Sequence, residues 1–151
     1  MAKMEKNSKV TKHEYICKLT DVVASKATCL RKQVGAVFIT EDFELLATGY
    51  NGAPRGFPHC TKETCNSKNR CTNTVHAEQN GIVQAARRGF SLDKSLLYSN
   101  YGPCAVCARM LVNLGVKAVY IKEEYHDNEG ISILRKGGIG VCTWEELNWT
   151  K

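Results

Sequence analysis

The chain has 151 residues, of which 43% are hydrophobic and 24% are charged, and its formal net charge is +6. This length and composition fit one globular domain with its own core, so we expect a single domain over residues 1–151. No apolar run approaches the ~20 residues that cross a bilayer, and the N-terminal residues lack the apolar core of a signal peptide. These features exclude a membrane partner and predict a cytoplasmic location.

The positive net charge favours an anionic partner, which leaves a phosphorylated small molecule and a nucleic acid as alternatives. The basic residues are scattered, and the lysines among residues 1–11 predict a flexible basic tail. No arginine-rich or aromatic stretch marks a track for nucleic acid, so this partner is disfavoured. Eight cysteines in a chain without a secretion signal indicate metal ligands and free thiols and not disulfides, because cytosol is reducing.

The first half of the chain predicts one helix and one hairpin. Apolar residues recur at helical spacing over residues 11–29, and this stripe is most simply core. Residues 34–39 and 44–48 are short apolar or alternating runs on either side of a polar turn, which is typical of a β-hairpin. Residues 49–74 then form a long loop rich in Gly, Pro, Asn, Lys and Cys. A loop of this length needs a function or something to hold it.

The second half alternates helices and strands. Helices are predicted over residues 75–88, from Pro103 to the residue before Gly115, and over residues 128–136, with Gly89 ending the first. Strands are predicted at residues 95–99, 117–121 and 139–143. This alternation predicts a three-layer α/β/α fold with a five-stranded mixed sheet.

Two short motifs supply the residues of a catalytic zinc site. They are His76-Ala77-Glu78 and Pro103-Cys104-Ala105-Val106-Cys107. A catalytic zinc keeps three protein ligands and one open position, and His76, Cys104 and Cys107 supply one imidazole and two thiolates. Glu78 is left to transfer protons between water, a ring nitrogen and the departing amine. This combination is the signature of zinc-dependent nucleobase deaminases.

Each motif alone has a simpler interpretation. A His-x-Glu triplet occurs by chance, and a Cys-x-x-Cys motif can be redox-active or half of a structural metal site. A zinc-held interaction protein without catalysis is a further alternative, although such a site has no need of the free carboxylate of Glu78. His76 and Glu78 are two residues apart, so they converge only if the first turn of their helix points at the metal.

Three segments carry a family resemblance. They are Gly49-Tyr50-Asn51-Gly52-Ala53-Pro54-Arg55-Gly56, Thr74-Val75-His76-Ala77-Glu78-Gln79-Asn80-Gly81-Ile82 and Tyr125-His126-Asp127. Through them the chain resembles the deoxycytidylate (dCMP) deaminases of the cytidine deaminase-like superfamily over nearly its whole length. The resemblance implies zinc-dependent hydrolysis of dCMP to dUMP and ammonia, which supplies thymidylate synthesis. Deamination of dCTP, a free nucleoside, guanine or a base in a nucleic acid is the alternative.

The resemblance also implies residues that bind the substrate. Asn51 would contact the deoxyribose 3′-OH, Tyr125 would pack against the substrate, and Ala77 would line its pocket. The simpler interpretation of Asn51-Gly52 is a turn dipeptide. The residues that bind the phosphate are not assigned, with Lys68, Arg70 and Arg109 as nearby candidates. The family often has alanine where this chain has Gly81, a change expected only to loosen the helix.

The same resemblance points to regulation by triphosphates. In the family, the glycine-rich loop lies near a site that binds dCTP as activator and dTTP as inhibitor, usually in a hexamer. Gly52, Pro54 and Gly56 are the matching loop residues here. The implied partners are these effectors, with Mg²⁺, and further copies of the chain in a homo-oligomer.

Four cysteines outside the catalytic motif suggest a second, structural Zn²⁺. Four thiolates make a closed tetrahedral site, and in some bacterial and phage dCMP deaminases cysteine or histidine occurs at matching places. Such a site would hold the long loop against the first helix. Unligated thiols are the alternative, with His59 able to replace one ligand, while Cys17 and Cys142 are expected to be ordinary thiols. The four candidates are Cys29, Cys60, Cys65 and Cys71.

Overall fold

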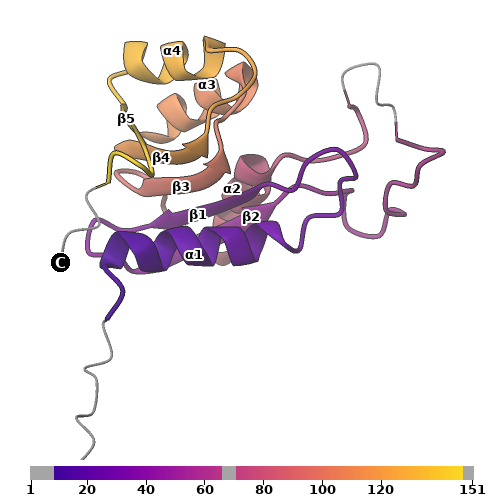
Figure 1. The fold of residues 1–151 in the computed structure, drawn as a ribbon, viewed down its shortest axis with the longest axis horizontal. Helices are drawn as coiled ribbons and strands as arrows, with labels where there is room; N and C mark the ends of the chain where they lie inside the picture. The colour runs from indigo at the N-terminus through magenta and orange to yellow at the C-terminus, as the bar shows by residue number, and fades with distance from the viewer. Residues whose placement is uncertain (1–8, 66–70, 148–151) are drawn as a thin grey trace, which may run out of the picture.

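The structure is a computed structural model that describes residues 9–65 and 71–147. Its described residues form four helices and five strands (Figure 1). The helices are α1 (Lys12–Ala24), α2 (Ala77–Arg88), α3 (Ala105–Leu114) and α4 (Glu129–Lys136). The strands are β1 (Gly35–Ile39), β2 (Leu45–Tyr50), β3 (Leu96–Tyr101), β4 (Ala118–Glu123) and β5 (Gly140–Thr143). Within the described ranges, no helix combines the length and the apolar character that a bilayer crossing requires.

The strands form one mixed sheet in the order β2-β1-β3-β4-β5. Strand β1 is antiparallel to β2 and β3, whereas β3, β4 and β5 are mutually parallel. The β1–β2 hairpin closes through the amide of Thr40, which donates to the carbonyl of Glu44 at 2.8 Å. The parallel strands end at the same edge, where open α/β sheets bind ligands.

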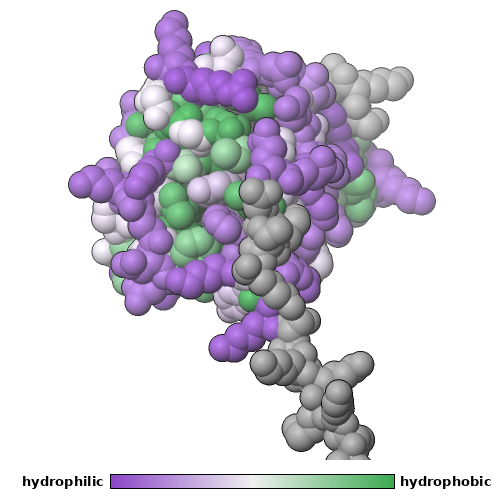
Figure 2. All heavy atoms as spheres, turned by 60° about the vertical axis from the view of Figure 1, so that its left-hand side comes forward, coloured by the Kyte–Doolittle hydropathy of each residue, from purple (hydrophilic) through white to green (hydrophobic). Residues whose placement is uncertain are grey.

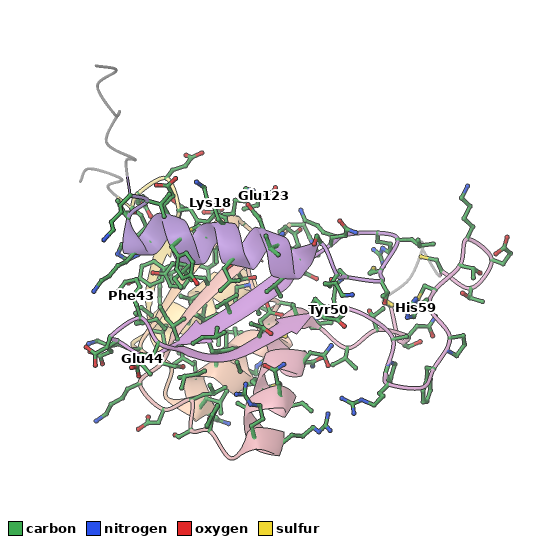
Figure 3. The ribbon with its side chains drawn as sticks, turned by 90° about the horizontal axis from the view of Figure 1, so that it is seen from below. Lys18, Phe43, Glu44, Tyr50, His59 and Glu123 are labelled. Atoms are coloured by element: carbon green, nitrogen blue, oxygen red, sulfur yellow. The ribbon has the colours of Figure 1, made fainter. Side chains whose placement is uncertain are left out.

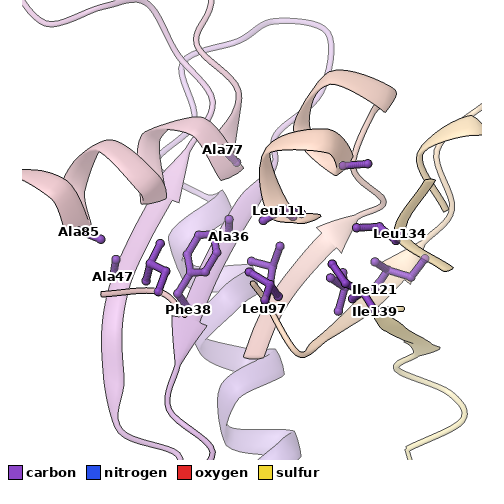
Figure 4. Close-up of a cluster of buried hydrophobic side chains, with 14 of the residues drawn as sticks. Ala36, Phe38, Ala47, Ala77, Ala85, Leu97, Leu111, Ile121, Leu134 and Ile139 are labelled. Carbon is purple, nitrogen blue, oxygen red and sulfur yellow. The ribbon is translucent and has the colours of Figure 1, made fainter. Parts of the chain in front are cut away.

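Helices cover both faces of the sheet, which confirms the predicted three-layer α/β/α architecture. Alternation along β1 separates two cores, with Phe38 in the cluster beneath α2, α3 and α4 and Val37 in the cluster beneath α1. Figure 4 shows Phe38, Leu97 and Leu111 in the first cluster. The second cluster contains Trp144, whose indole nitrogen donates to the carbonyl of Tyr120 at 3.1 Å.

The structure corrects two predicted helix boundaries. Helix α1 ends at Ala24, five residues before the predicted end, because the chain turns so that the amide of Thr28 donates to the carbonyl of Asn51. Helix α3 begins at Ala105, with Cys104 as its N-cap, so Pro103 precedes the helix and does not open it. The predicted C-terminal glycines are correct, since Gly89 and Gly115 have φ of 73° and 74°.

The long loop between β2 and α2 is held at its two ends. Gly52 and Val75 form an isolated antiparallel bridge with hydrogen bonds of 3.2 and 2.9 Å. Gly52 must be a glycine here, because a Cβ atom would lie 2.5 Å from Oγ1 of Thr28. Between these ends the described part of the loop projects away from the sheet (Figure 1). The residues at its base are therefore fixed where the sheet edge and α2 meet.

Candidate active site

The N-termini of α2 and α3 bring the two motifs together. His76 is the N-cap of α2 and Cys104 is the N-cap of α3, so each stands at the start of its helix in extended backbone. The amide of His76 donates to Oε1 of Gln79 at 2.9 Å, which fixes the turn that carries the imidazole. Cys107 lies in the first turn of α3, three residues after Cys104, on the same face.

The three side chains fit one zinc ion. Nδ1 of His76 lies 3.5 Å from Sγ of Cys104 and 3.4 Å from Sγ of Cys107. Ligands at usual Zn–N and Zn–S lengths around one tetrahedral ion are separated by about 3.6 Å. All three ligand atoms lie within 4.8 Å of one another, and no other group of three among the described residues does so. One imidazole and two thiols at these separations have the spacing of a catalytic zinc site.

The thiols of Cys104 and Cys107 have pKa values that are shifted in opposite directions. The hydrogen bond with Cys107, supported by His76, lowers the pKa of Cys104 to about 3. The same contact, with burial, raises the pKa of Cys107. One sulfur is therefore held as a thiolate at neutral pH, and metal binding would release the proton of the other.

Glu78 lies in the first turn of α2 and is almost fully buried, with 4% of its surface exposed. Burial raises the pKa of its carboxyl above the usual range. His76 and Glu78 both face the same cleft because α2 begins there, which is the geometry that their two-residue spacing demands. A buried carboxyl beside a metal site, with its pKa moved towards neutrality, suits acid–base chemistry.

These residues line a cleft of ≈ 780 Å³ at the carboxyl edge of the sheet. The cleft has room for a small molecule. All three residues assigned to the substrate by resemblance also line it: Asn51, Ala77 and Tyr125. Tyr125 packs against Tyr101 with ring centroids 5.3 Å apart, so two aromatic rings form one wall.

Asn51 has a structural task in addition to the one expected. Its Nδ2 donates to the carbonyl of Lys32 at 2.7 Å, and its Oδ1 accepts from the amide of Val34 at 2.8 Å. Each polar group retains capacity for one further hydrogen bond. Contact with a substrate hydroxyl therefore stays a prediction, made by a side chain that already holds the segment before β1.

The regulatory residues expected from the resemblance do not line this cleft. Gly52 is part of the bridge to Val75, and Gly56 has a φ of 82°, which favours glycine. Pro54 lies between them in the described part of the loop. Regulation at these three positions stays a prediction.

The four cysteines of the proposed structural site lie near one another but not in ligand geometry. Partial burial, followed by the neighbouring thiols of Cys71, Cys29 and Cys65, raises the pKa of Cys60. Oγ1 of Thr74 bonds Sγ of Cys71 at 3.3 Å and lowers its pKa. Figure 3 shows sulfur atoms in the loop region that carries His59. No three of these sulfurs lie within 4.8 Å of one another.

Several cleft residues were not found from the sequence. Arg31, Lys32 and Tyr101 line the cleft, and none belongs to a recognised motif. Tyr101 ends β3, so the rule that ligands bind at the carboxyl ends of parallel strands could have indicated it. Of the phosphate candidates, Arg109 lines the cleft and pairs with Glu129 at 3.4 Å. Lys68 and Arg70 lie outside the described residues.

Comparisons with known proteins agree with this site. Residues 10–123 match the family described as cytidine and deoxycytidylate deaminase zinc-binding region. ComE operon protein 2 of Bacillus subtilis is 34% identical over 118 residues, which cover 78% of this chain and 62% of that protein. Deoxycytidylate deaminase of Saccharomyces cerevisiae is 33% identical over 136 residues, which cover 84% of this chain and 43% of that protein. The chain thus spans about half the length of these two relatives.

A solved structure is similar over most of both chains. It is the dCMP deaminase from the cyanophage S-TIM5 in complex with dCMP and dUMP. The TM-score is 0.79 at 33% sequence identity, and the match covers 86% of this chain and 94% of that chain.

Proposed function

Because the chain belongs to the cytidine and deoxycytidylate deaminase zinc-binding family, we propose that it catalyses the hydrolytic deamination of dCMP to dUMP and ammonia. The observation that carries this proposal is the convergence of His76, Cys104 and Cys107 beside the buried carboxyl of Glu78. In a cell or a virus this reaction would supply dUMP for thymidylate synthesis.

His76, Cys104 and Cys107 would hold the zinc, which when bound makes water nucleophilic at neutral pH. Glu78 takes a proton from the attacking water and delivers it to the ring nitrogen N3 of cytosine. A second proton then passes to the amino group at C4, which leaves as ammonia. Water and dCMP are consumed and dUMP and ammonia are formed, so the atoms balance.

The cleft residues position the substrate in this proposal. Asn51 and Tyr125 line the same cleft as Ala77 and Glu78 at the start of α2. Asn51 would bond the deoxyribose 3′-OH, Ala77 would contact the base and Tyr125 would pack against the nucleotide. The aromatic wall and the polar amide match the apolar and polar parts of a nucleotide.

The test is ammonia release from dCMP, dCTP, CMP, deoxycytidine and guanine in parallel, with and without dCTP and dTTP. We expect turnover of dCMP well above that of the other substrates. Turnover of dCTP or guanine, without turnover of dCMP, would show that dCMP is not the substrate. Inactivity on all five would favour a base in RNA or single-stranded DNA, or an inactive zinc scaffold.

A second zinc is part of the proposal, held by Cys29, Cys60, Cys65 and Cys71. Its support is the electrostatic effect that three of these thiols have on the fourth, and the need to hold a long loop. Cys60→Ser should lower the zinc content from two per chain to about one and destabilise the fold, as measured by elemental analysis and thermal unfolding. Cys142→Ser is the control, and unchanged zinc in Cys60→Ser would remove Cys60 from the ligand set.

Triphosphate regulation and assembly complete the proposal. The loop with Gly52, Pro54 and Gly56 would bind dCTP or dTTP with Mg²⁺, in a cytoplasmic homo-oligomer such as a hexamer. A contiguous exposed apolar surface would support an oligomer, because such patches mark interaction sites. Figure 2 shows solvent-exposed apolar side chains at the centre of one face.

A further inference from the structure

The segment between α1 and β1 has no regular secondary structure, but side-chain hydrogen bonds fix its backbone. The side chain of Asn51 bonds the carbonyl of Lys32 and the amide of Val34. The side chain of Asn100 bonds the carbonyl of Gln33 at 3.0 Å and the amide of Gly35 at 2.9 Å. Two amide side chains thus fix four consecutive residues, and the first of these presents its side chain to the cleft.

Lys32 stands at the end of the aromatic wall of the cleft. Its Nζ lies 3.7 Å from the ring centroid of Tyr101, and Tyr101 packs against Tyr125. Tyr125 in turn lines the same cleft as the metal ligands His76 and Cys104. The wall therefore runs from the metal site through two tyrosine rings to one ammonium group.

The charges around the cleft separate Lys32 from the other cations. Arg109 pairs with Glu129, and Asp127 lines the cleft beside this pair, so that side is acidic. Arg31 lies towards the long loop, where its charge adds a small part to the lowering of the pKa of Cys71 that the hydrogen bond from Thr74 dominates. Among the described residues that line the cleft, Lys32 is the cation that lies over the ring of Tyr101.

The ion pair of Lys32 is easily exchanged. Its Nζ lies 2.7 Å from Oε2 of Glu123, with 40% and 59% of the two side chains exposed. Exposed pairs of this kind contribute little to stability, so a phosphate dianion can take the place of Glu123 at little cost. The ion pair therefore orients the ammonium group of Lys32 and still leaves it able to bind a phosphate.

We propose that Lys32 recognises the 5′-phosphate of the substrate and makes the site select a nucleotide over a nucleoside. This inference rests on the proposed deamination of dCMP. A base held at the metal and a sugar packed along Tyr125 and Tyr101 bring a 5′-phosphate to the end of the wall, where Lys32 lies. Glu123 is the carboxylate that the phosphate displaces.

The test compares kcat/KM for dCMP and for deoxycytidine in Lys32→Gln. We expect the preference for dCMP to fall by about tenfold or more, the effect of losing one charge-assisted hydrogen bond, with deoxycytidine changed less than about twofold. Glu123→Gln should lower the KM for dCMP, because the competing carboxylate is gone. Lys32→Arg should keep the preference, because it keeps the charge.

Lys122→Gln is the matched control. Lys122 is similarly exposed and makes a 2.9 Å ion pair with Asp21 on α1, but it does not line the cleft. It should leave both substrates unaffected. A Lys32→Gln variant that keeps the full preference for dCMP would overturn the inference, as would equal losses in Lys32→Gln and Glu123→Gln, since those would mark a merely structural pair.

Binding of the product gives a readout that does not depend on turnover. By calorimetry, Lys32→Gln should bind dUMP about tenfold more weakly than the wild type, with deoxyuridine unchanged. Equal dUMP affinity in the two proteins would contradict the role of Lys32. A wild type that turns over no dCMP would instead overturn the proposed function, so the two failures are distinct.

Discussion

Glu78 is a carboxyl that the fold keeps out of water without using it as a metal ligand. Burial of an ionisable group is unfavourable unless the group is paired or has a function. The carboxyl lies at the positive end of α2, which partly offsets this cost. Its burial, its raised pKa and its place beside three ligand side chains together indicate proton transfer.

Glu78→Gln should therefore keep the metal and lose the reaction. The amide fills the same volume but cannot accept a proton from water, so kcat should fall by about 10²–10⁴-fold while zinc per chain is unchanged. Steady-state kinetics and elemental analysis measure the two quantities. Glu44→Gln is the control, since Glu44 lies at the hairpin, away from the loop that carries His59 (Figure 3). Undiminished activity would rule out the proton transfer assigned to Glu78.

The ligands and Glu78 could be predicted because their chemistry depends on residue type and spacing. The tasks of Asn51 and Lys32 could not, because they depend on which segments meet in space. The backbone that Asn51 holds lies 17 and 19 residues away from it along the chain. A dipeptide motif carries no information about such a contact.

Among the single elements, α2 contains a glycine, Gly81, that close packing against the sheet requires. A Cβ atom at Gly81 would lie 2.6 Å from Cε2 of Phe38, and that ring is fully buried between α2 and the sheet. The expectation that Gly81 merely loosens the helix is therefore incomplete. The missing side chain lets α2 approach β1 closely.

Gly81→Ala should destabilise the protein although alanine is the better helix former. The gain in helix propensity is about 1 kcal/mol, and overpacking a core costs about 1–3 kcal/mol. We expect the free energy of unfolding to fall by roughly 1 kcal/mol in urea denaturation. Val83→Ala, at an exposed position of the same helix, is the control. A more stable Gly81→Ala protein would show that the ring of Phe38 can move aside.

Helix α1 meets the sheet through a half-buried histidine. Nδ1 of His13 shares a hydrogen bond of 2.6 Å with the hydroxyl of Tyr98, and its ring packs against Phe43 and Tyr120. Burial lowers the pKa of His13 from its ordinary value of 6.5. Protons therefore bind the unfolded chain more tightly than the folded one at this residue.

This shift predicts how stability depends on pH. The contribution of His13 is fully present above pH 6.5 and is lost as the pH falls below that value towards the lower folded pKa. Thermal unfolding from pH 7.5 to 5 should show a shallower decline in His13→Gln than in the wild type. The difference between the two proteins isolates His13 from the other histidines, and parallel curves would contradict the assignment.

At the scale of the whole molecule, local patterns predicted the order and type of all nine described elements. The alternation of apolar residues in strands and the glycines that end helices are local signals, so the sequence alone can reveal them. The start of α3 was misplaced, because Pro103 was predicted as the first helical residue but precedes the N-cap Cys104. The cleft depends on several chain segments meeting at one sheet edge, and only the fold brings them there.

The organisation of the molecule gives the two metal motifs a common purpose. Two helices of the same layer begin at one edge of the sheet, one bringing His76 and Glu78 and the other bringing Cys104 and Cys107. The loop before α2 and the segment before β1 complete the cleft around them. We propose that this junction deaminates dCMP with zinc.

The measurement that tests this claim most directly is ammonia release from dCMP by the zinc-loaded protein, by the protein after chelation, and by the protein after zinc is restored. We expect activity to disappear when the metal bound by His76, Cys104 and Cys107 is removed, and to return with zinc. Turnover that survives complete removal of the metal, or a zinc-loaded protein that releases no ammonia from dCMP, would contradict the account.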